Sequence, residues 1–239
     1  MNILIVEDDV IIADTIRMTL SQSGHHSIHA MTIEHALTEI AHAEFDAVLL
    51  DINLPEGDGT RLTRMIRRGK NPAPILVVSG NSTVDDRINA LGSGADGYLT
   101  KPFDKDELMA HLDAIIRRTN GHSSSIVNAG NMRVDLNRKL VTINEQFVPL
   151  THKEFQIVNL LAMRKGAVLS KSAFISNIYG GIDEPDSKIV DVFICKLRLK
   201  LSKHGLDGAK VETVWGQGYM LTEFESQDNT AHPQHHLAS

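Results

Sequence analysis

The first 120 residues alternate between two hydrophobic periods, and this alternation limits the possible folds more than any other feature of the sequence. Short, wholly apolar runs at 3–6, 47–50 and 75–78 are separated by segments with apolar residues at helical spacing, as in 108–116. Strands that are apolar on both faces are typical of a parallel sheet that helices cover on both sides. Right-handed crossovers between such strands give a doubly wound α/β fold. We therefore expect a doubly wound (βα)5 domain over residues 1–118.

The second half has a different pattern. A polar Gly/Ser stretch at 119–125 indicates a flexible linker that leaves the two halves loosely coupled. Expected elements then follow in order: strands at 132–135, 140–143 and 147–150 with a turn near Asn144–Glu145, helices at 151–163, 170–179 and 189–201, and a hairpin at 211–221. Thr151 and Glu154 have the spacing of a capping box. Three helices and a hairpin predict an α+β winged helix-turn-helix domain over 126–222, before a disordered, His-rich tail at 223–239.

Composition narrows the class of protein. A length of 239 residues suggests two domains, and no run approaches the roughly 18 apolar residues that span a bilayer. Cys195 is the one cysteine, so an internal disulfide and a Cys-rich zinc site are excluded. Met1 opens directly into a strand-like run without a basic leader, so we expect a cytoplasmic protein with no membrane partner. The net charge of −6 combines an acidic first half with a mildly basic second domain, which suggests a different partner for each.

Polar residues follow four of the five expected strands of the first half. They are Glu7, Asp8 and Asp9 after the first strand, Asp51 after the third, Ser79 after the fourth and Lys101 after the fifth. The carboxyl ends of parallel strands share one edge, so these side chains meet in one cleft. Converging carboxylates attract a hard cation such as Mg²⁺, and a carboxylate beside Mg²⁺ can attack a phosphoryl group. Asp9 is either part of this pocket or the N-cap of the next helix.

Four sequence pieces in this half carry a resemblance to a known family. The pieces are ILIVEDD, LLDINLPEGDG, SG at 79–80 and GADGYLTKPF, and with them residues 1–118 resemble the receiver domain of two-component response regulators. The resemblance implies that a histidine kinase or phosphotransferase phosphorylates Asp51. It also implies roles for further residues: Mg²⁺ held by Glu7, Asp8, Asp51 and the backbone carbonyl of Asn53, a switch pair of Ser79 and Tyr98, and Lys101, before a cis proline, paired with the phosphoryl group.

The same resemblance implies a homodimer when the protein is phosphorylated or on DNA. The face made by the fourth helix, fifth strand and fifth helix would pair with its copy, with Arg87 and Glu107 as candidates for intermolecular ion pairs. At two positions where the family has an acid and its basic partner, this chain has Gly97 and His111. We therefore expect dimerisation through this face that is weaker, or more sensitive to pH, than the family pattern implies.

The helix expected near 188–201 has two contrasting faces. One is apolar and is expected in the core: Val190, Ile194, Leu197 and Leu201. The other combines lysines with small apolar groups: Lys188, Val192, Cys195, Lys196 and Leu199. Lysines can meet phosphates or guanine in a DNA major groove, and apolar atoms can meet thymine methyl groups. Without arginine, asparagine or glutamine on this face, the sequence predicts an AT-rich half-site with adjacent thymines.

The pieces LTHKEFQIVNLL, VDVFICKLRLKL and TVWGQGY show that residues 126–222 resemble the winged-helix output domain of the OmpR/PhoB class. KGAVLSKSAFISNIYGGIDEPDSKIVDVFICKLRLKL is similar, more narrowly, to a branch that controls the cell cycle in alphaproteobacteria. The resemblance implies direct repeats of TTAA-like elements in double-stranded promoter DNA. The expected contact residues are Lys188, Val192, Cys195, Lys196, Arg198, Leu199, Lys200, Trp215 and Gln217. Trp215 stands where the class often has a wing arginine, and Gln217 stands where the narrower branch has an arginine.

Two further segments contain clustered polar residues. The acidic loop 180–186 is either an ordinary surface loop or, as the class implies, a contact with RNA polymerase through Gly180, Ile182, Asp183 and Glu184. The histidines at 25, 26 and 29 make a poor metal site, because strand alternation divides them between two faces, and we expect surface histidines.

Three functions compete. The first is a phosphorylation-controlled transcription regulator that binds DNA as a dimer and is not an enzyme. The second is an aspartyl-nucleophile phosphatase of the haloacid dehalogenase type, which uses the same residue types with Mg²⁺. That class places a second aspartate two residues after the nucleophile as general acid, and here Asn53 holds this position. The third is a DNA-binding scaffold whose first domain binds proteins without phosphate. The complete acidic pocket favours the first.

Overall fold

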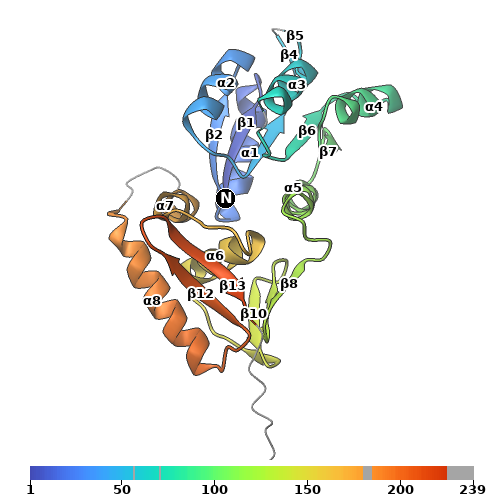
Figure 1. Ribbon diagram of the computed structural model, residues 1–239. Helices are drawn as coiled ribbons and strands as arrows, with labels where there is room; N and C mark the ends of the chain where they lie inside the picture. Colours follow the sequence, from blue (N-terminus) through green and yellow to red (C-terminus); the bar gives the residue numbers. More distant parts are fainter. Residues whose placement is uncertain (56, 70, 180–184, 225–239) are drawn as a thin grey trace, which may run out of the picture.

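A five-stranded parallel sheet forms the centre of the N-terminal domain (Figure 1). The computed structural model describes residues 1–55, 57–69, 71–179 and 185–224. The strand order is β2-β1-β3-β6-β7, with β1 (Asn2–Val6), β2 (His26–Ala30), β3 (Ala47–Leu50), β6 (Ile75–Ser79) and β7 (Gly97–Thr100). Every residue of β3 and β6 is buried, as expected of strands that are apolar on both faces.

Five helices cover the two faces of this sheet. They are α1 (Val10–Gln22), α2 (Ile33–His42), α3 (Thr60–Arg68), α4 (Val84–Gly92) and α5 (Lys105–Thr119). Buried side chains of α1 and α5 pack on one face, and those of α2, α3 and α4 pack on residues that point to the other. The predicted doubly wound fold is thereby confirmed. One hairpin, β4 (Asn53–Leu54) with β5 (Gly57–Asp58), was not expected, because strands of two residues have no periodicity to detect.

The C-terminal domain combines an antiparallel sheet, three helices and a hairpin. The sheet has the order β11-β10-β9-β8, with β8 (Ile126–Ala129), β9 (Met132–Asp135), β10 (Leu140–Ile143) and β11 (Gln146–Phe147). The helices are α6 (His152–Met163), α7 (Lys171–Tyr179) and α8 (Lys188–Lys203), and the hairpin is β12 (Ala209–Val214) with β13 (Gly218–Glu223). This order confirms the expected winged helix-turn-helix.

Local details of this domain agree with the sequence in part. Asn144 and Glu145 both have positive φ, as a tight hairpin turn requires, and Thr151 and Glu154 form the predicted capping box. The last expected strand of the small sheet is wrong in its bounds, because pairing covers 146–147 rather than 147–150. The strand β8 was missed because its four residues follow directly on the polar stretch.

A glycine fixes the hairpin against the rest of the C-terminal domain. Tyr219 exchanges two backbone hydrogen bonds with Leu169, which precedes α7. Next to it, Gly218 lies so close to the Leu169 carbonyl that a Cβ atom would stand 1.9 Å from its oxygen. Only glycine fits this contact, so the position of the hairpin against the segment before α7 depends on it.

Direct contacts join the two domains, contrary to the loose coupling that the composition of 119–125 predicts. Arg164 Nη2 lies 3.0 Å from Asp46 Oδ1, and the Gln156 side-chain amide donates to the Gly24 carbonyl at 3.3 Å. The polar segment therefore connects two domains that already contact one another. Within the described part of the chain, every helix is too short or too polar to cross a bilayer.

Candidate functional sites

Three carboxylates converge at the carboxyl end of the parallel sheet. Glu7 follows β1 and is 2% exposed, and Asp51 follows β3 and is also buried. One oxygen each of Glu7, Asp8 and Asp51 lies within 4.8 Å of the others. Among the described residues, this is the one group of three or more such side chains close enough to share a metal ion. Three hard oxygen donors at this spacing fit a divalent cation such as Mg²⁺.

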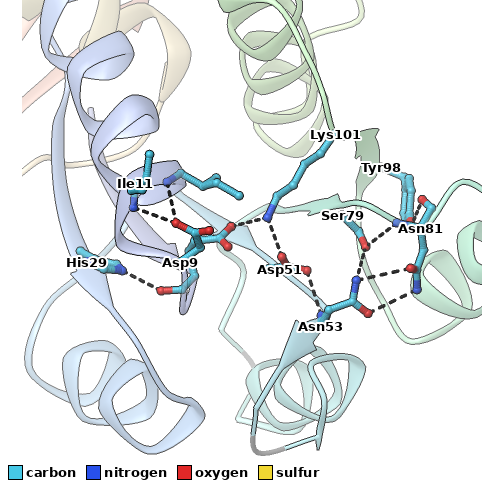
Figure 2. Close-up of polar contacts among 11 residues, drawn as sticks. Asp9, Ile11, His29, Asp51, Asn53, Ser79, Asn81, Tyr98 and Lys101 are labelled. Atoms are coloured by element: carbon cyan, nitrogen blue, oxygen red, sulfur yellow. Dashed lines mark hydrogen bonds and ion pairs between the residues drawn. The ribbon is translucent and has the colours of Figure 1, made fainter.

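Lys101 is the cation that faces these carboxylates (Figure 2). Its Nζ lies 2.6 Å from Glu7 Oε2 and 2.6 Å from Asp51 Oδ2. Burial would lower the pKa of Lys101, but hydrogen bonds to Asp51 and Glu7 outweigh burial, so the pKa is raised and the charge is retained. Burial raises the pKa of Glu7 despite its bond to Lys101. The peptide bond between Lys101 and Pro102 is cis, as the resemblance implies.

Asp9 is a helix cap. Its Oδ1 accepts hydrogen bonds from the backbone N–H groups of Ile11 and Ile12, at 2.8 and 3.2 Å (Figure 2). A capping carboxylate satisfies the free amides of the first helical turn. Of the two interpretations open for this residue, the cap is the one that the structure supports.

A chain of polar contacts leads from Asp51 to Tyr98 (Figure 2). The Asn53 backbone N–H donates to Asp51 Oδ1 at 2.8 Å, and the Asn53 side chain donates to Ser79 Oγ at 3.2 Å. The Ser79 oxygen also accepts from the backbone of Asn81, whose carbonyl accepts from the Tyr98 hydroxyl at 2.9 Å. A change at Asp51 can therefore reach Tyr98 through Asn53, Ser79 and Asn81, the last of which lies in the β6–α4 loop.

Sequence reasoning missed two residues of this site. Asn81 links Ser79 to Tyr98, and its position in the loop after the fourth strand was the available signal. Gly59 lies behind Asp51, where a Cβ atom would stand 2.6 Å from the Asp51 carbonyl oxygen. This glycine lets the chain after the β4–β5 hairpin approach the end of β3.

The histidines at 25, 26 and 29 are half-buried rather than fully exposed, and among the described residues they do not form a group close enough to share a metal ion. His25 lies against the C-terminal domain, and its Nδ1 is buried without a partner. Burial, reinforced by the positive charges of the N-terminal amine and Lys139, lowers the pKa of His25 to about 3. His29 instead hydrogen-bonds the Glu7 carbonyl at 2.7 Å and so supports the loop of the acidic pocket.

The surface of α8 carries most of the expected DNA-binding residues. Val190, Ile194, Leu197 and Leu201 are buried, as the helical wheel predicts. The opposite face is exposed and consists of Lys188, Val192, Cys195, Lys196 and Leu199, the last of them 59% exposed. The hairpin turn beside it holds Gln217 and Trp215, which is 90% exposed. These side chains are therefore free to contact another molecule.

Two of the expected DNA contacts have partners within the protein instead. Arg198 donates to the Val211 carbonyl and to Thr213 Oγ1, both at 2.8 Å, so it ties α8 to β12. Lys200 binds the buried carboxylate of Glu154 at 2.7 Å. The structure therefore does not bring Arg198 and Lys200 to the exposed face of α8.

Asp191 on α8 is also used within the domain. Its Oδ2 binds Lys171 Nζ at 2.7 Å, and its Oδ1 accepts from the Tyr219 hydroxyl at 2.5 Å. The hydrogen bond from Lys171 is the main reason that the pKa of Asp191 is lowered. Burial and the bond to Asp191 raise the pKa of Tyr219 to about 12. The contact joins α7, α8 and the hairpin in one arrangement.

Two expected sites remain, the dimerisation surface and the contact with RNA polymerase. Arg87 and Glu107 are exposed on α4 and α5, and His111 is half-buried on α5. Beside them, Val84, Ile88 and Leu91 form an exposed apolar stripe along α4. The residues expected to contact RNA polymerase, at 180 and 182–184, lie outside the described residues.

Two families match the two domains. The family described as "Response regulator receiver domain" matches residues 3–113, and "Transcriptional regulatory protein, C terminal" matches residues 144–221. Proteins named "Cell cycle response regulator CtrA" from Brucella anthropi and Brucella ovis are 42% identical over 227 residues, which is 95% of this chain and 98% of each relative.

Solved structures of response regulators also resemble the chain. The Thermotoga maritima response regulator DrrB, an OmpR/PhoB homologue, is 26% identical with a TM-score of 0.46, over 92% of this chain and 98% of that one. The receiver domain of the Francisella response regulator 1452 is 30% identical with a TM-score of 0.47, over 49% of this chain and 98% of that one.

Proposed function

Because the chain belongs to the response regulators with an OmpR/PhoB-type DNA-binding domain, we propose that phosphorylation of Asp51 controls how it binds promoter DNA. The family makes it a CtrA-like transcription regulator rather than an enzyme. We take residues 1–118 as the receiver domain, 119–125 as the linker and 126–222 as the DNA-binding domain. In this division the receiver accepts the phosphoryl group and the second domain contacts the promoter.

The observation that carries the proposal is the position of Asp51. Its buried carboxylate ends the central strand β3, beside Glu7, Asp8 and Lys101. Glu7, Asp8, Asp51 and the backbone carbonyl of Asn53 would hold Mg²⁺, which when bound neutralises the carboxylates and the incoming phosphoryl oxygens. An Asp51 oxygen then bonds to phosphorus while the bond from phosphorus to the donor breaks, and the donor keeps that electron pair.

Phosphorylation changes the contacts that Asp51 can make. It raises the negative charge of the side chain to about −2 and adds acceptor oxygens. Lys101, already 2.6 Å from Asp51 Oδ2, would pair with the phosphoryl group, and the Ser79 hydroxyl would donate to it. When Ser79 turns away from Asn53 and Asn81, the loop that holds the Tyr98 hydroxyl changes. Tyr98 would then reshape the surface of α4, β7 and α5.

We propose that this surface forms the homodimer of the phosphorylated protein. Arg87 and Glu107 are exposed there and would pair across the interface, with His111 close to them on α5. The apolar stripe on α4 adds area that a partner copy would bury. In a two-fold dimer the same patch serves both partners, so each ion pair occurs twice.

For DNA, we propose that the exposed face of α8 enters the major groove. Lys188 and Lys196 would contact phosphates or guanine, and Val192, Cys195 and Leu199 would contact thymine methyl groups. Trp215 and Gln217 of the hairpin would lie at the adjacent minor groove. Two protomers would occupy AT-rich, TTAA-like direct repeats about 10 base pairs apart.

The proposed partners are a histidine kinase or phosphotransferase as phosphate donor, promoter DNA and RNA polymerase. The polymerase contact rests on the class alone, because its residues lie outside the described part of the chain.

A phosphotransfer assay tests the proposal. Labelled acetyl phosphate with Mg²⁺ should label the wild type, whereas Asp51→Asn should take up no label. Asp8→Ala should also fail, because it removes a metal ligand, and a metal chelator should have the same effect on the wild type. Asp9→Asn keeps the cap and serves as the matched control that labels normally. Full labelling of Asp51→Asn would show that another residue accepts the phosphate.

A further inference from the structure

The turn of the β12–β13 hairpin lies beside the beginning of α8 (Figure 1). Trp215 in this turn lines one cleft with Ser187, the residue that precedes α8. The Tyr219 hydroxyl on β13 donates to Asp191 in the first turn of the helix. A molecule that covers the exposed face of α8 at Lys188 therefore lies next to the hairpin turn.

The hairpin is held in place from both of its strands. Arg198 of α8 donates to two oxygens of β12, each at 2.8 Å. On β13, the backbone of Tyr219 exchanges two hydrogen bonds with Leu169. These contacts exist within the chain itself, so the backbone that carries Trp215 loses little freedom when a partner binds.

The turn offers aromatic surface and no positive charge. Between positions 211 and 218 the charged residue is Glu212, and Lys210 beside it lies 3.6 Å from that carboxylate. The side chain at the tip is the neutral indole of Trp215, which is 90% exposed. A tip without a cation gains no counterion release from DNA phosphates. What it can give DNA is a flat aromatic face, which stacks on bases of any sequence.

The minor groove determines how DNA can use such a face. Apolar side chains that enter this groove insert between two base pairs, which partly unstacks the step and bends the duplex toward the major groove. Pyrimidine–purine steps such as TA unstack and kink more easily than other steps. The bend also brings more DNA surface onto the protein, which offsets the cost of unstacking.

We propose that Trp215 is an apolar wedge that inserts into a pyrimidine–purine step of the minor groove beside the half-site, so that the hairpin selects DNA by how easily this step bends. The inference rests on the proposed function, because it requires α8 in the adjacent major groove. The exposed amide of Gln217 then donates to the acceptors that adenine and thymine present in the minor groove. The wedge adds a preference for TA over AA steps outside the bases that α8 reads.

The test uses half-site duplexes in which a TA step is moved through the flanking positions, with an AA step as the reference. The chain has a single tryptophan, so the intrinsic fluorescence of the full-length protein reports on Trp215 alone. Energy transfer between dyes at the two ends of the duplex measures the bend.

Three variants change the ring. Trp215→Ala removes it, Trp215→Phe keeps an aromatic face, and Trp215→Arg puts a cation on the turn. Phe224→Ala is the matched control, because it removes an exposed aromatic ring beyond the other end of β13. Neither ring is buried, so each variant should fold.

At one flanking position, the wild type should bind the TA duplex more tightly than the AA duplex, bend it and lose tryptophan fluorescence. There Trp215→Ala should bind at least roughly fivefold more weakly, the lower end of the range for a base stacked on an aromatic ring, and should lose the bend. Trp215→Phe should retain most of both, and Phe224→Ala should match the wild type. The salt slope should stay the same for Trp215→Ala and become steeper by about 0.9 for Trp215→Arg.

Two results would overturn the proposal. An equal loss by Trp215→Ala on TA and AA duplexes, without a change in bend, would mean that the ring lies in the groove without wedging. Unquenched fluorescence, with wild-type affinity of Trp215→Ala, would mean that the turn faces a protein instead of DNA. Lys196→Ala separates this inference from the proposed function. If it also leaves half-site affinity unchanged, the placement of α8 in the groove fails and the inference with it, whereas a defect of Lys196→Ala alone counts against the wedge only.

Discussion

Arg198 and Lys196 are two residues apart on α8, yet the structure predicts different consequences for replacing each with alanine. The Arg198 guanidinium donates to the Val211 carbonyl and to Thr213 Oγ1, and it lies 5.6 Å from the centre of the Tyr219 ring. Lys196 is exposed and has none of these contacts. Arg198→Ala should therefore lower the stability of the folded protein, and Lys196→Ala should lower the affinity for DNA directly.

The magnitudes follow from these contacts. Arg198→Ala loses two hydrogen bonds from a charged donor that is only partly buried, so the free energy of unfolding should fall by about 2 kcal/mol. DNA affinity should also fall, because α8 loses one of its connections to the hairpin, but the dependence on salt should stay the same. If Lys196 neutralises one phosphate, Lys196→Ala should reduce the slope of log Kd against log salt by about 0.9. If it reads a base, it should cost about 1–3 kcal/mol and relax the sequence preference there.

Urea unfolding and DNA titrations at three salt concentrations would separate the two variants. Between about 50 and 200 mM salt, a slope change of about 0.9 makes the Lys196→Ala defect shrink by roughly 3.5-fold. The Arg198→Ala defect should not shrink. The reasoning is refuted if Arg198→Ala keeps wild-type stability and shows the shallower salt slope, because Arg198 would then contact DNA.

Three further predictions concern stability, dimerisation and base reading. The folded protein keeps His25 neutral, whereas the unfolded chain binds a proton below the ordinary pKa of 6.5. Wild-type stability should therefore drop by about 1.4 kcal/mol more than that of His25→Gln between about pH 7.5 and 5.5, and parallel unfolding curves would contradict this. Arg87→Glu should weaken the phosphorylated dimer in sedimentation and Glu107→Arg should partly restore it, while unchanged dimers in both variants would exclude this face. Replacing thymine by uracil in the half-site should weaken binding at the bases that Val192 or Cys195 contacts, and indifference at every position would exclude methyl reading.

The sequence predicted most of the fold because its hydrophobic periods are strong. The fully apolar runs of β3 and β6 and the capping box of Thr151 and Glu154 are local signals, and the structure confirms them. The β4–β5 hairpin could not be predicted in this way, because each strand has two residues. The β8 strand was missed for a similar reason, since four residues next to a polar linker carry little periodicity.

The candidate sites show the same limit. The rule that strands end at a common edge was enough to bring Glu7, Asp8 and Asp51 together. The helical wheel of α8 placed Arg198 outside the core but could not show that it bends toward the hairpin. The contact between Asp46 and Arg164 joins residues 118 positions apart, and no pattern along the chain indicates it. Periodicity therefore predicts individual helices and strands well. It does not predict which side chains form contacts between one element and another.

The central claim is that phosphorylation of Asp51 controls binding to DNA. The most direct measurement is the Kd for a duplex with two AT-rich direct repeats, taken with and without acetyl phosphate and Mg²⁺, for the wild type and Asp51→Asn. The proposed mechanism predicts tighter binding by the phosphorylated wild type and no response from Asp51→Asn, which keeps the fold but offers no carboxylate nucleophile. Equal affinity of the wild type in both conditions, with Asp51 shown to be phosphorylated, would contradict it and favour a scaffold that binds DNA without a phosphate signal.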